Sequence, residues 1–271
     1  MAEELGRHHP LVKRIRALRG SSAARRAAGV FLAEGLHLAD EALRRRAPVE
    51  GLVHSRGFER TPAGAELIAR VRHAGLELHA VAADLMRSLQ DARSPQPVLT
   101  LVRLPESIEP GAGVAALLGA ARVLLLHGVQ DPGNLGSLVR SAHAAGAAHV
   151  WIDGAGCDPF HPRAVRATMG SIFAVPVTPV DLTLLLPLLH ASSFVTWAAC
   201  SGGGRDYRDL DFGERAALVL GAEGAGLPEP IVGACRGRVT IPMCDGVESL
   251  SVAAAGAVLL FATCRREISD G

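Results

Sequence analysis

Two absences limit where this chain can work. Hydrophobic residues make up 49% of its 271 residues, but they form no uninterrupted run of the ~18 residues that a membrane-spanning helix needs. The start of the chain, Met1-Ala2-Glu3-Glu4, is acidic and no apolar segment follows it closely, so no secretory signal is predicted. We therefore expect a soluble, cytoplasmic protein that does not contact membranes.

Cysteine pairs and three common catalytic signatures are also missing. The five cysteines are scattered, which predicts neither a disulfide framework nor a zinc knuckle, and we expect buried free thiols and no metal site. No strand is followed by a Gly-x-Gly-x-x-Gly turn, and the chain has no Gly-x-Ser-x-Gly elbow and no phosphate-loop lysine. These absences disfavour a nicotinamide-dependent oxidoreductase, a serine hydrolase and a kinase.

The order of the apolar segments predicts an α/β protein with two domains. Residues 30–103 alternate short apolar runs with helical patterns, which is typical of a small α/β sandwich. Residues 105–113 are rich in turn formers, which indicates a linker. Six later apolar segments predict a mostly parallel sheet covered on both faces: residues 123–126, 150–152, 174–177, 194–198, 217–220 and 239–241. The predicted boundaries are 1–105 for the first domain, 106–117 for the linker and 118–271 for the second domain.

Two glycine-punctuated loops follow the last two predicted strands. In residues 220–228, Gly221, Gly224 and Gly226 permit the positive φ angles and the close backbone approach of a ligand-gripping turn. The second loop leads into an Ala- and Leu-rich run, residues 250–261, which has the composition of a well-buried helix. Two such loops held side by side can surround a small ligand.

Positive charge is concentrated in the first part of the chain. Residues 1–105 carry 17 Arg and Lys against 11 acidic residues, whereas residues 106–271 carry 11 against 16. A basic segment suits a polyanion, because neutralising phosphates releases counterions, although a solvated helix face can have the same composition. The candidate phosphate contacts are the basic residues of the densest stretch: Lys13, Arg14, Arg16, Arg19, Arg25 and Arg26.

A helix-start pattern follows the first strand of the predicted second domain. Pro132 and Gly133 are expected to make a turn, and Asn134 is expected to cap the helix that follows. Arg140 lies ~9 Å farther along the helix axis, and its long side chain can lean back toward the helix start, where free N–H groups attract anions. A phosphate or a developing oxyanion could bind there; alternatively, Asn134 is only a cap and Arg140 only a surface side chain.

Three segments carry a resemblance to a known family. They are Asp131-Pro-Gly-Asn-Leu-Gly-Ser-Leu-Val-Arg-Ser-Ala142 (motif one), Leu220-Gly-Ala-Glu-Gly-Ala-Gly-Leu227 (motif two), and Ile241-Pro-Met243 followed by Glu248-Ser-Leu-Ser-Val-Ala253 (motif three). In order and spacing they resemble the motifs of the SpoU/TrmH family of RNA ribose 2′-O-methyltransferases, within the SPOUT superfamily. Arg166-Ala-Thr-Met-Gly-Ser171 resembles a further family segment, and the front half is similar to the ribosomal-protein-like RNA-binding domain of many members.

The resemblance implies a fold, a cofactor and partners. The C-terminal α/β domain is expected to form a deep trefoil knot, to hold S-adenosylmethionine between the knotted loops and to form a homodimer. RNA is the expected partner, with the basic residues above as its contacts, and the two-domain arrangement resembles enzymes that modify ribosomal RNA more than the single-domain transfer RNA enzymes. The positions that match the family's contacts with the methyl donor are Gly221, Ile241 and Leu250, with Ala199 and Met243 as further candidates.

The resemblance also implies four catalytic residues: Asn134, Arg140, Glu223 and Ser249. A ribose 2′-hydroxyl is a weak nucleophile, so the site must stabilise negative charge on its oxygen and align it with the sulfonium methyl group. Arg140 can supply that charge, but a guanidinium titrates above ~12 and is poorly suited to be the general base, so we expect the proton to pass to phosphate or water. Asn134 would orient Arg140 or the nucleotide, and Glu223 would fix the motif-two loop or pair with a cation. Ser249, expected to cap the last helix, would bind the nucleotide.

One position departs from the family pattern. Motif three commonly contains Ser-Leu-Asn-Val, whereas this chain has a serine, Ser251, in place of the asparagine. Serine keeps a hydrogen-bonding oxygen but loses the second arm of the amide, which puts its placement of the target ribose in question. Two alternative functions stay open: a non-catalytic RNA-binding protein that kept the fold, and base methylation by a related knotted enzyme.

Overall fold

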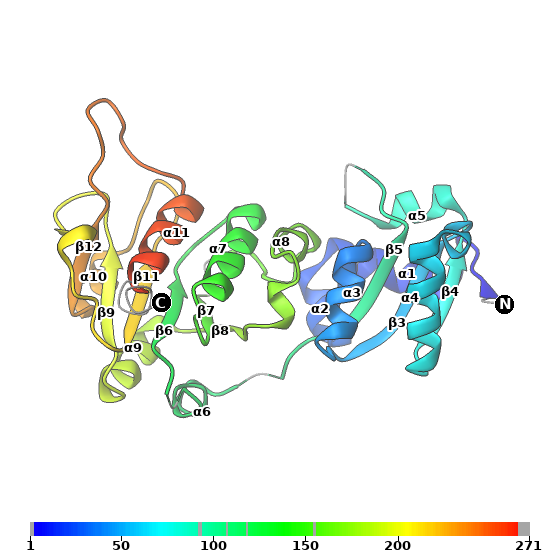
Figure 1. Cartoon of the computed structure of the whole chain (residues 1–271), viewed down its shortest axis with the longest axis horizontal. Coiled ribbons are helices and arrows are strands. Elements are labelled where there is room, and N and C mark those ends of the chain that lie inside the picture. The colour runs from blue at the N-terminus through cyan, green and yellow to red at the C-terminus, as the bar shows by residue number, and fades with distance from the viewer. Residues whose placement is uncertain (1–2, 92–93, 107, 118, 154–155, 265–271) are drawn as a thin grey trace. The chain divides into compact units, whose positions relative to one another are not determined.

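The computed structural model describes most of the chain, and Figure 1 shows its elements. The described ranges are residues 3–91, 94–106, 108–117, 119–153 and 156–264. The chain divides into two compact units. The first contains Met1–Pro105 and Asp158–Phe173, and the second contains Glu106–Cys157 and Ala174–Gly271. Within the described ranges, no helix is both long enough and apolar enough to cross a bilayer.

A five-stranded mixed sheet forms the centre of the first unit. Its strands, in sheet order, are β1 (Glu3–Glu4), β4 (Glu77–Val81), β3 (Val49–Ser55), β5 (Val98–Arg103) and β2 (Val30–Glu34). The pairs β1–β4 and β4–β3 are parallel, whereas β5 runs antiparallel to both β3 and β2. The small α/β sandwich predicted for residues 30–103 is confirmed.

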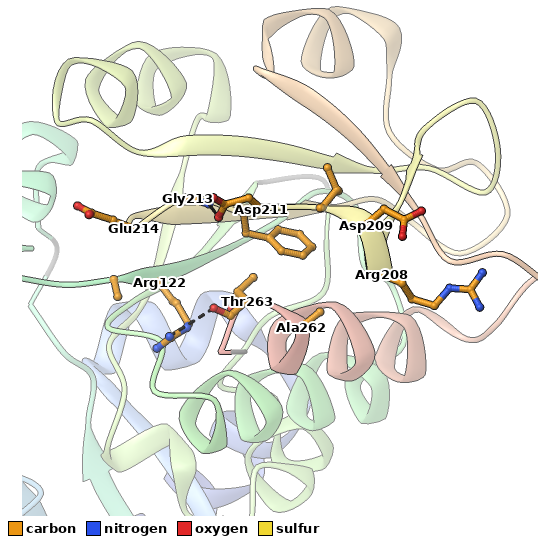
Figure 2. A pocket seen from close by; sticks show the side chains of 11 residues that line it. Arg122, Arg208, Asp209, Asp211, Gly213, Glu214, Ala262 and Thr263 are labelled. Carbon is orange, nitrogen blue, oxygen red and sulfur yellow. Dashed lines mark hydrogen bonds between the residues drawn. The ribbon is translucent and has the colours of Figure 1, made fainter. Parts of the chain in front are cut away.

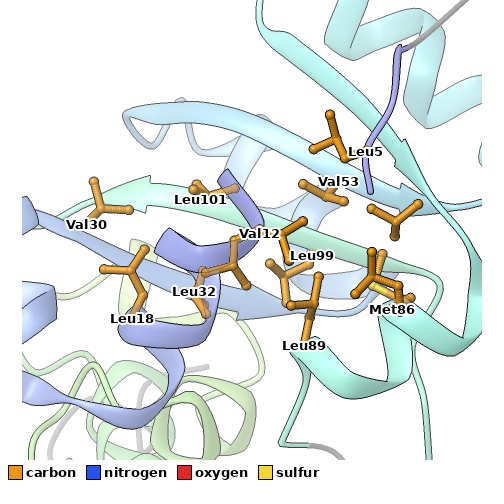
Figure 3. Close-up of a cluster of buried hydrophobic side chains, with 13 residues drawn as sticks. Leu5, Val12, Leu18, Val30, Leu32, Val53, Met86, Leu89, Leu99 and Leu101 are labelled. Carbon is orange, nitrogen blue, oxygen red and sulfur yellow. The ribbon is translucent and has the colours of Figure 1, made fainter. Parts of the chain in front are cut away.

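Helices cover both faces of this sheet. They are α1 (Pro10–Gly20), α2 (Ser22–Ala28), α3 (Leu36–Arg44), the 3-10 helix η1 (Phe58–Arg60), α4 (Pro62–His73) and α5 (Ala83–Leu89). In α1, Val12 and Leu18 recur on one side of the helix and pack with Leu32 and Leu99 from the strands, together with Met86 of α5 (Figure 3). On the opposite face, α3 and α4 pack against the alternate residues of the strands.

A seven-stranded sheet forms the centre of the second unit. Its strands, in sheet order, are β10 (Arg205–Asp206), β12 (Gly237–Thr240), β9 (Val195–Ala199), β11 (Ala216–Leu220), β6 (Arg122–Leu126), β7 (Val150–Asp153) and β8 (Val177–Val180). All neighbouring strands are parallel, which confirms the predicted sheet. The strand predicted at 174–177 instead begins at Val177, because Pro176 has no N–H to donate to a ladder.

The second sheet is also covered on both faces. Its helices are α6 (Pro110–Ala115), α7 (Pro132–Ala144), α9 (Leu182–Ala191), the 3-10 helix η3 (Tyr207–Asp209), α10 (Glu229–Ala234) and α11 (Val252–Ala262). Helices α6 and α9 share one face, where Leu185 packs with Leu125 and Val219 of the strands. The prediction that 106–117 is only a linker is wrong, because α6 forms there and Val114 and Leu117 join this core.

Helix α11 packs where α7 meets the end of β11, on the other face of the sheet. A Cβ at Gly256 would lie 2.3 Å from Leu138 Cδ2 and 2.8 Å from Leu220 Cδ1, so a residue without a side chain is needed for this close approach. The contact joins elements of all three motifs. The prediction of a well-buried helix is wrong for the outer side of α11, where Phe261 is 48% exposed; its apolar residues lie all around the helix, and only one side has a partner in the single chain.

The segment Asp158–Phe173 lies in the first unit, although the predicted second domain spans it. It contains α8 (Pro162–Ala167) and the 3-10 helix η2 (Ser171–Phe173). Phe160 and Val165 pack in one buried cluster with Phe31 and Ala33 of β2. This segment therefore covers part of the sheet that the first 105 residues leave open.

All five cysteines are free thiols. Cys264 is buried, whereas Cys244 is exposed and the other three are partly buried. The expectation of buried thiols is therefore correct for Cys264 alone.

His149 gives the fold a measurable dependence on pH. Its ring is buried, stacks on Trp151 with centroids 4.1 Å apart and lies 3.0 Å from Thr178 Oγ1. Burial lowers the pKa of His149 from 6.5 to about 4. Between these values the unfolded chain binds a proton that the folded chain does not, so stability is complete above pH 6.5 and falls as the pH drops toward 4.

Each pKa unit corresponds to about 1.4 kcal/mol, so His149 should lower the free energy of unfolding by about 3 kcal/mol between pH 7 and pH 4. Glutamine does not titrate, so we expect this acid-dependent loss to be absent in His149→Gln. Urea unfolding measured between pH 7 and pH 4 would show the difference. His8→Gln, at an exposed position, is the control. Equal pH dependence in His149→Gln and the wild type would contradict the assignment.

Candidate active site

Three predicted donor-binding positions lie at one edge of the second sheet. Ala199 ends β9, Gly221 follows β11, and Ile241 follows β12. Because β12, β9 and β11 are adjacent and parallel, with Val239 opposite Ala199, their carboxyl ends meet at the same edge, and neighbouring strands lie ~4.8 Å apart. The structure therefore brings Ala199, Gly221 and Ile241 to one place.

The motif-two loop folds tightly back on itself. The Gly226 N–H donates to the carbonyl of Ala222 at 2.9 Å, and Gly224 and Gly226 have φ angles of +82° and +66°. A Cβ at Gly221 would lie 2.2 Å from the carbonyl carbon of Gly226. The prediction that these glycines serve positive φ angles and close approach is confirmed, and a side chain at Gly221 would displace the loop.

The start of motif one meets the motif-two loop. The N–H of His127 donates to the carbonyl of Leu220 at 2.9 Å. Between the first turn of α7 and the motif-two loop, Asn134 Nδ2 donates to Glu223 Oε1 at 2.8 Å. Two predicted catalytic residues from distant parts of the chain are thus joined by a hydrogen bond.

Asn134 is not the cap of α7, contrary to the prediction. Asp131 is the N-cap, its Oδ1 accepts from the N–H of Asn134 at 2.9 Å, and Pro132 is the first helical residue. Aspartate followed by proline is a favourable helix start, because proline has no N–H that needs a partner at that position. The side chain of Asn134 is therefore available for Glu223.

Ser249 is not the cap of the last helix either. Helix α11 begins at Val252, and the Oγ of Ser251 accepts from the N–H of Ala254 at 3.3 Å. Ser249 lies two residues earlier and is exposed. The residue that departs from the family pattern, Ser251, therefore has a structural role of its own.

Of the remaining predicted residues, Arg140, Ser249 and Leu250 are exposed and Met243 is partly buried. Arg140 is exposed on α7 and has no hydrogen bond or ion pair within the described part of the chain. Met243 and Leu250 lie in residues 241–251, which form a long loop without helix or strand that projects from the sheet in Figure 1, and Leu250 is 40% exposed. The single chain thus brings Ala199, Gly221 and Ile241 together at the edge of the sheet. No described contact joins these three residues to the other predicted site residues: Arg140, Ser249, Met243 and Leu250.

A pocket of about 440 Å³ lies elsewhere in the second unit, near Arg122 at the start of β6 and Glu214 before β11. Arg122 Nη2 donates to the carbonyl of Thr263 at 3.4 Å (Figure 2). These are the amino ends of the strands, so this cavity lies at the opposite edge from the motifs. A smaller cavity of about 210 Å³ lies beside His190 and Ile231, between α9 and α10.

The edge suits a nucleoside cofactor. Gly221 has no side chain and Ala199 a small one, so the ends of β11 and β9 expose backbone groups. Ile241, which is partly buried, adds apolar surface where the motif-three loop begins. Backbone groups combined with apolar surface are the usual lining of a small-molecule site.

The basic residues of the first unit divide into two groups. Lys13, Arg16 and Arg26 are exposed, as expected for phosphate contacts. Arg14 pairs with Glu50 at 2.9 Å, and the Nη1 of Arg19 donates to the carbonyl of Ser88 at 2.7 Å, so both are partly engaged.

Arg25 does not fit the predicted role of an RNA contact. Its side chain is 3% exposed, and its guanidinium donates twice to one carboxylate oxygen of Asp158 and once to the carbonyl of Leu18. Charge counting along the sequence could not separate Arg25 from Arg26, because the partner lies 133 positions away.

Several residues at the edge were missed in the sequence. Asp131-Pro132 is itself a helix-start signal, and Gly256 stands out as a glycine within an alanine-rich helix. His127 Nδ1 lies 2.7 Å from Asp153 Oδ2, a contact between the ends of β6 and β7 that no local pattern predicts. Such contacts become visible only when the strand order is known.

Comparison with known proteins agrees with this geometry. The model of the SpoU rRNA methylase family matches residues 121–261, and that of the MRM3-like substrate binding domain matches residues 9–100. The 23S rRNA (guanosine(2553)-2′-O)-methyltransferase RlmP of Bacillus subtilis is 29% identical over 85% of this chain and 87% of its own length. The 23S rRNA (uridine(2479)-2′-O)-methyltransferase of Streptomyces viridochromogenes is 29% identical over 99% of this chain and 98% of its own.

A solved structure supports the same assignment. The AdoMet-bound rRNA methyltransferase of Sinorhizobium meliloti has a TM-score of 0.83 at 30% identity, and the match covers 98% of each chain. The family model alone spans more than half of the present sequence, with all three motifs inside it. The chain belongs to the SpoU rRNA methylase family.

Proposed function

We propose that this protein transfers the methyl group of S-adenosylmethionine to a ribose 2′-hydroxyl of ribosomal RNA. The observation that carries the proposal is the bond between Asn134 of motif one and Glu223 of motif two, at the sheet edge where the donor-binding positions meet. The two relatives that act on 23S rRNA are named for a guanosine and a uridine. The proposal therefore names the ribose hydroxyl and leaves the base open.

The methyl donor would be held by Gly221, Ile241, Leu250, Ala199 and Met243. When bound, S-adenosylmethionine supplies an electrophilic methyl group on a sulfonium centre. The residues of the edge contribute backbone groups for the polar parts of the nucleoside and apolar surface for its rings. Gly221 keeps the motif-two loop in its folded-back form, so the loop presents the same backbone groups to each donor molecule.

Asn134 and Glu223 would orient the RNA hydroxyl. A carboxylate only accepts hydrogen bonds, so the bond to Glu223 fixes which side of the Asn134 amide is the NH₂ group. The Oδ1 of Asn134 then faces away from Glu223 and can accept from the ribose hydroxyl or from Arg140. Glu223 therefore acts by holding Asn134 in one orientation.

Arg140 would stabilise the charge that develops on the 2′-oxygen. Its guanidinium is exposed and has no partner within the described ranges, so it can approach the phosphate next to the target ribose. A fixed positive charge favours the ionised hydroxyl, and the proton leaves to phosphate or water. Ser249 lies beside Leu250 and would contact the same nucleotide.

The first unit would bind RNA through its exposed basic residues, chiefly Lys13, Arg16 and Arg26, with Arg14 and Arg19 at the edge of the same surface. The second unit would carry the trefoil knot and form a homodimer in the cytoplasm. The exposed Phe261 of α11 offers apolar surface to a second copy. A non-catalytic protein and base methylation are less well supported, because both relatives are named as ribose 2′-O-methyltransferases.

We expect Arg140→Ala to lower methyl transfer by at least 100-fold, because loss of one charge-stabilising donor typically has an effect of this size. Transfer of labelled methyl groups to protein-free 23S ribosomal RNA measures the rate, and calorimetry should find the affinity for S-adenosylmethionine within twofold of the wild type. Arg238→Ala, at an exposed position of the same unit, is the control. Normal activity of Arg140→Ala would remove the proposed role.

The Asn134–Glu223 bond can be tested by reversal. Asn134→Asp keeps the shape but places two carboxylates against each other, so the motif-two loop should loosen and its amides at 221–227 should exchange hydrogen faster. The helix itself should not suffer, since an acidic residue in its first turn is favourable. Adding Glu223→Gln restores a donor and should restore slow exchange; if the double variant exchanges as fast as Asn134→Asp alone, the bond does not hold the loop.

The capping role of Ser251 predicts how substitutions there behave. Ser251→Asn should leave the free energy of unfolding nearly unchanged, because asparagine caps as well as serine, whereas Ser251→Ala should lower it by about 1 kcal/mol. Urea unfolding of the three proteins gives the comparison. An unchanged free energy of unfolding in Ser251→Ala would mean that the cap bond contributes nothing.

A further inference from the structure

We propose that the segment Asp158–Phe173 makes methyl transfer depend on RNA binding, and that Arg25 and Glu34 are the positioning residues that hold it. The inference rests on the proposed function. It concerns how the first unit acts on the second, through residues that contact neither the methyl donor nor the RNA.

The first attachment is the ion pair between Arg25 and Asp158. The guanidinium Nη2 and Nε lie 2.6 and 2.8 Å from the same oxygen of Asp158, and the two side chains are 3% and 19% exposed. The other carboxylate oxygen accepts from the N–H of Phe160 at 2.9 Å, which shapes the turn before α8. A buried pair of this kind fixes geometry strongly, because separating the partners leaves a charge without water.

The second attachment is the ion pair between Glu34 and Arg166. Glu34 is fully buried in its side chain, with one oxygen 2.7 Å from Arg166 Nη1 and the other accepting from the N–H of Asp91 at 2.8 Å. Both carboxylate oxygens are thus used. Arg166 opens the further family-like segment, so the pair anchors that segment to the end of β2.

Apolar contacts fill the space between the two ion pairs. The ring of Phe31 lies 4.9 Å from that of Phe160 and 6.2 Å from that of Phe173, and Val165 is fully buried beside them. His37 Nε2 lies 3.2 Å from the carbonyl of Met169. The whole segment, from its first residue to its last, is held by β2, α2 and α3.

The same segment continues directly into motif one. Asp158 follows Cys157, whose N–H donates to the carbonyl of Val129 at 2.9 Å. The preceding Gly156 packs so closely that a Cβ there would lie 3.0 Å from the same carbonyl oxygen. Val129 lies two residues before Asp131, the N-cap of the helix that carries Asn134 and Arg140. Along the chain, Asp158 is thus linked to the residues just before that helix by one peptide bond and one hydrogen bond.

Helix α2 carries both a proposed RNA contact and a residue that holds the segment. Arg26 is exposed and is a proposed RNA contact, whereas its neighbour Arg25 is buried against Asp158. RNA that binds Arg26 restrains α2, and this restrains Arg25, Asp158 and Val129 in turn. The catalytic helix start is then best ordered when RNA occupies the first unit.

The test compares two isosteric variants with a matched control. Asp158→Asn and Glu34→Gln each remove a charge and replace one of the two acceptor oxygens with an NH₂ group, while keeping the shape of the side chain. Asp40→Asn alters an ion pair of the same unit, 2.8 Å between Asp40 and Arg70, that does not involve the segment. Protein-free 23S ribosomal RNA is the probe, and single-turnover methyl transfer, RNA affinity and S-adenosylmethionine affinity are the measurements.

We expect Asp158→Asn and Glu34→Gln to lower the single-turnover rate at saturating RNA at least tenfold, with both affinities within twofold of the wild type, and Asp40→Asn to change none of the three. A purely structural role would lower the rate and RNA affinity together. An unchanged rate, or a rate that falls only in step with RNA affinity, would overturn the proposal. If Asp158→Asn does not fold, Glu34→Gln and Arg25→Lys carry the same comparison.

Hydrogen exchange separates this inference from the proposed function, because it needs no turnover. RNA should slow amide exchange at residues 127–134 in the wild type and in Asp40→Asn, and this protection should be lost in Asp158→Asn. If the wild type binds RNA without transferring a methyl group, the proposed function fails while the exchange result still decides the coupling. Protection confined to the first unit in the wild type would refute the coupling.

Discussion

Parallel pairing of β12, β9, β11 and β6 is the constraint on which the site depends. In a parallel sheet every strand ends at the same edge, so loops far apart in the chain become neighbours. Helix α11 covers this part of the sheet, and Gly256 lets it contact both Leu138 of α7 and Leu220 of β11. The backbone of the sheet thus brings the three motifs together. The hydrogen bond between Asn134 and Glu223 then links two segments that the sheet already holds close to each other.

The sequence was informative wherever the signal was local. Continuous apolar runs predicted the strands of the second sheet, and the glycines of motif two predicted a loop that needs positive φ angles. Helix starts were placed less well, because several polar residues compete as caps. The cap predicted at Asn134 is Asp131 and the cap predicted at Ser249 is Ser251, so the caps lie three and two residues from the predicted positions.

Non-local contacts were beyond the sequence in principle. Nothing in the charge pattern distinguishes Arg25, which is buried against Asp158, from the exposed Arg26 next to it. Equally, the apolar face of β2 shows that a covering element must exist, but it does not say that α8 supplies it. The predicted boundary at residue 105 follows composition along the chain, whereas compact packing follows contacts in space, and the two disagree over residues 158–173.

The return of Asp158–Phe173 to the first unit limits how far the two units are independent of each other. The chain crosses from one unit to the other after residues 105, 157 and 173, so no single excision releases either unit intact. A fragment limited to residues 1–105 would expose Phe31 and would leave Arg25 and Glu34 without their partners Asp158 and Arg166. A front half that keeps its packing must therefore include residues 158–173 from the second half of the sequence.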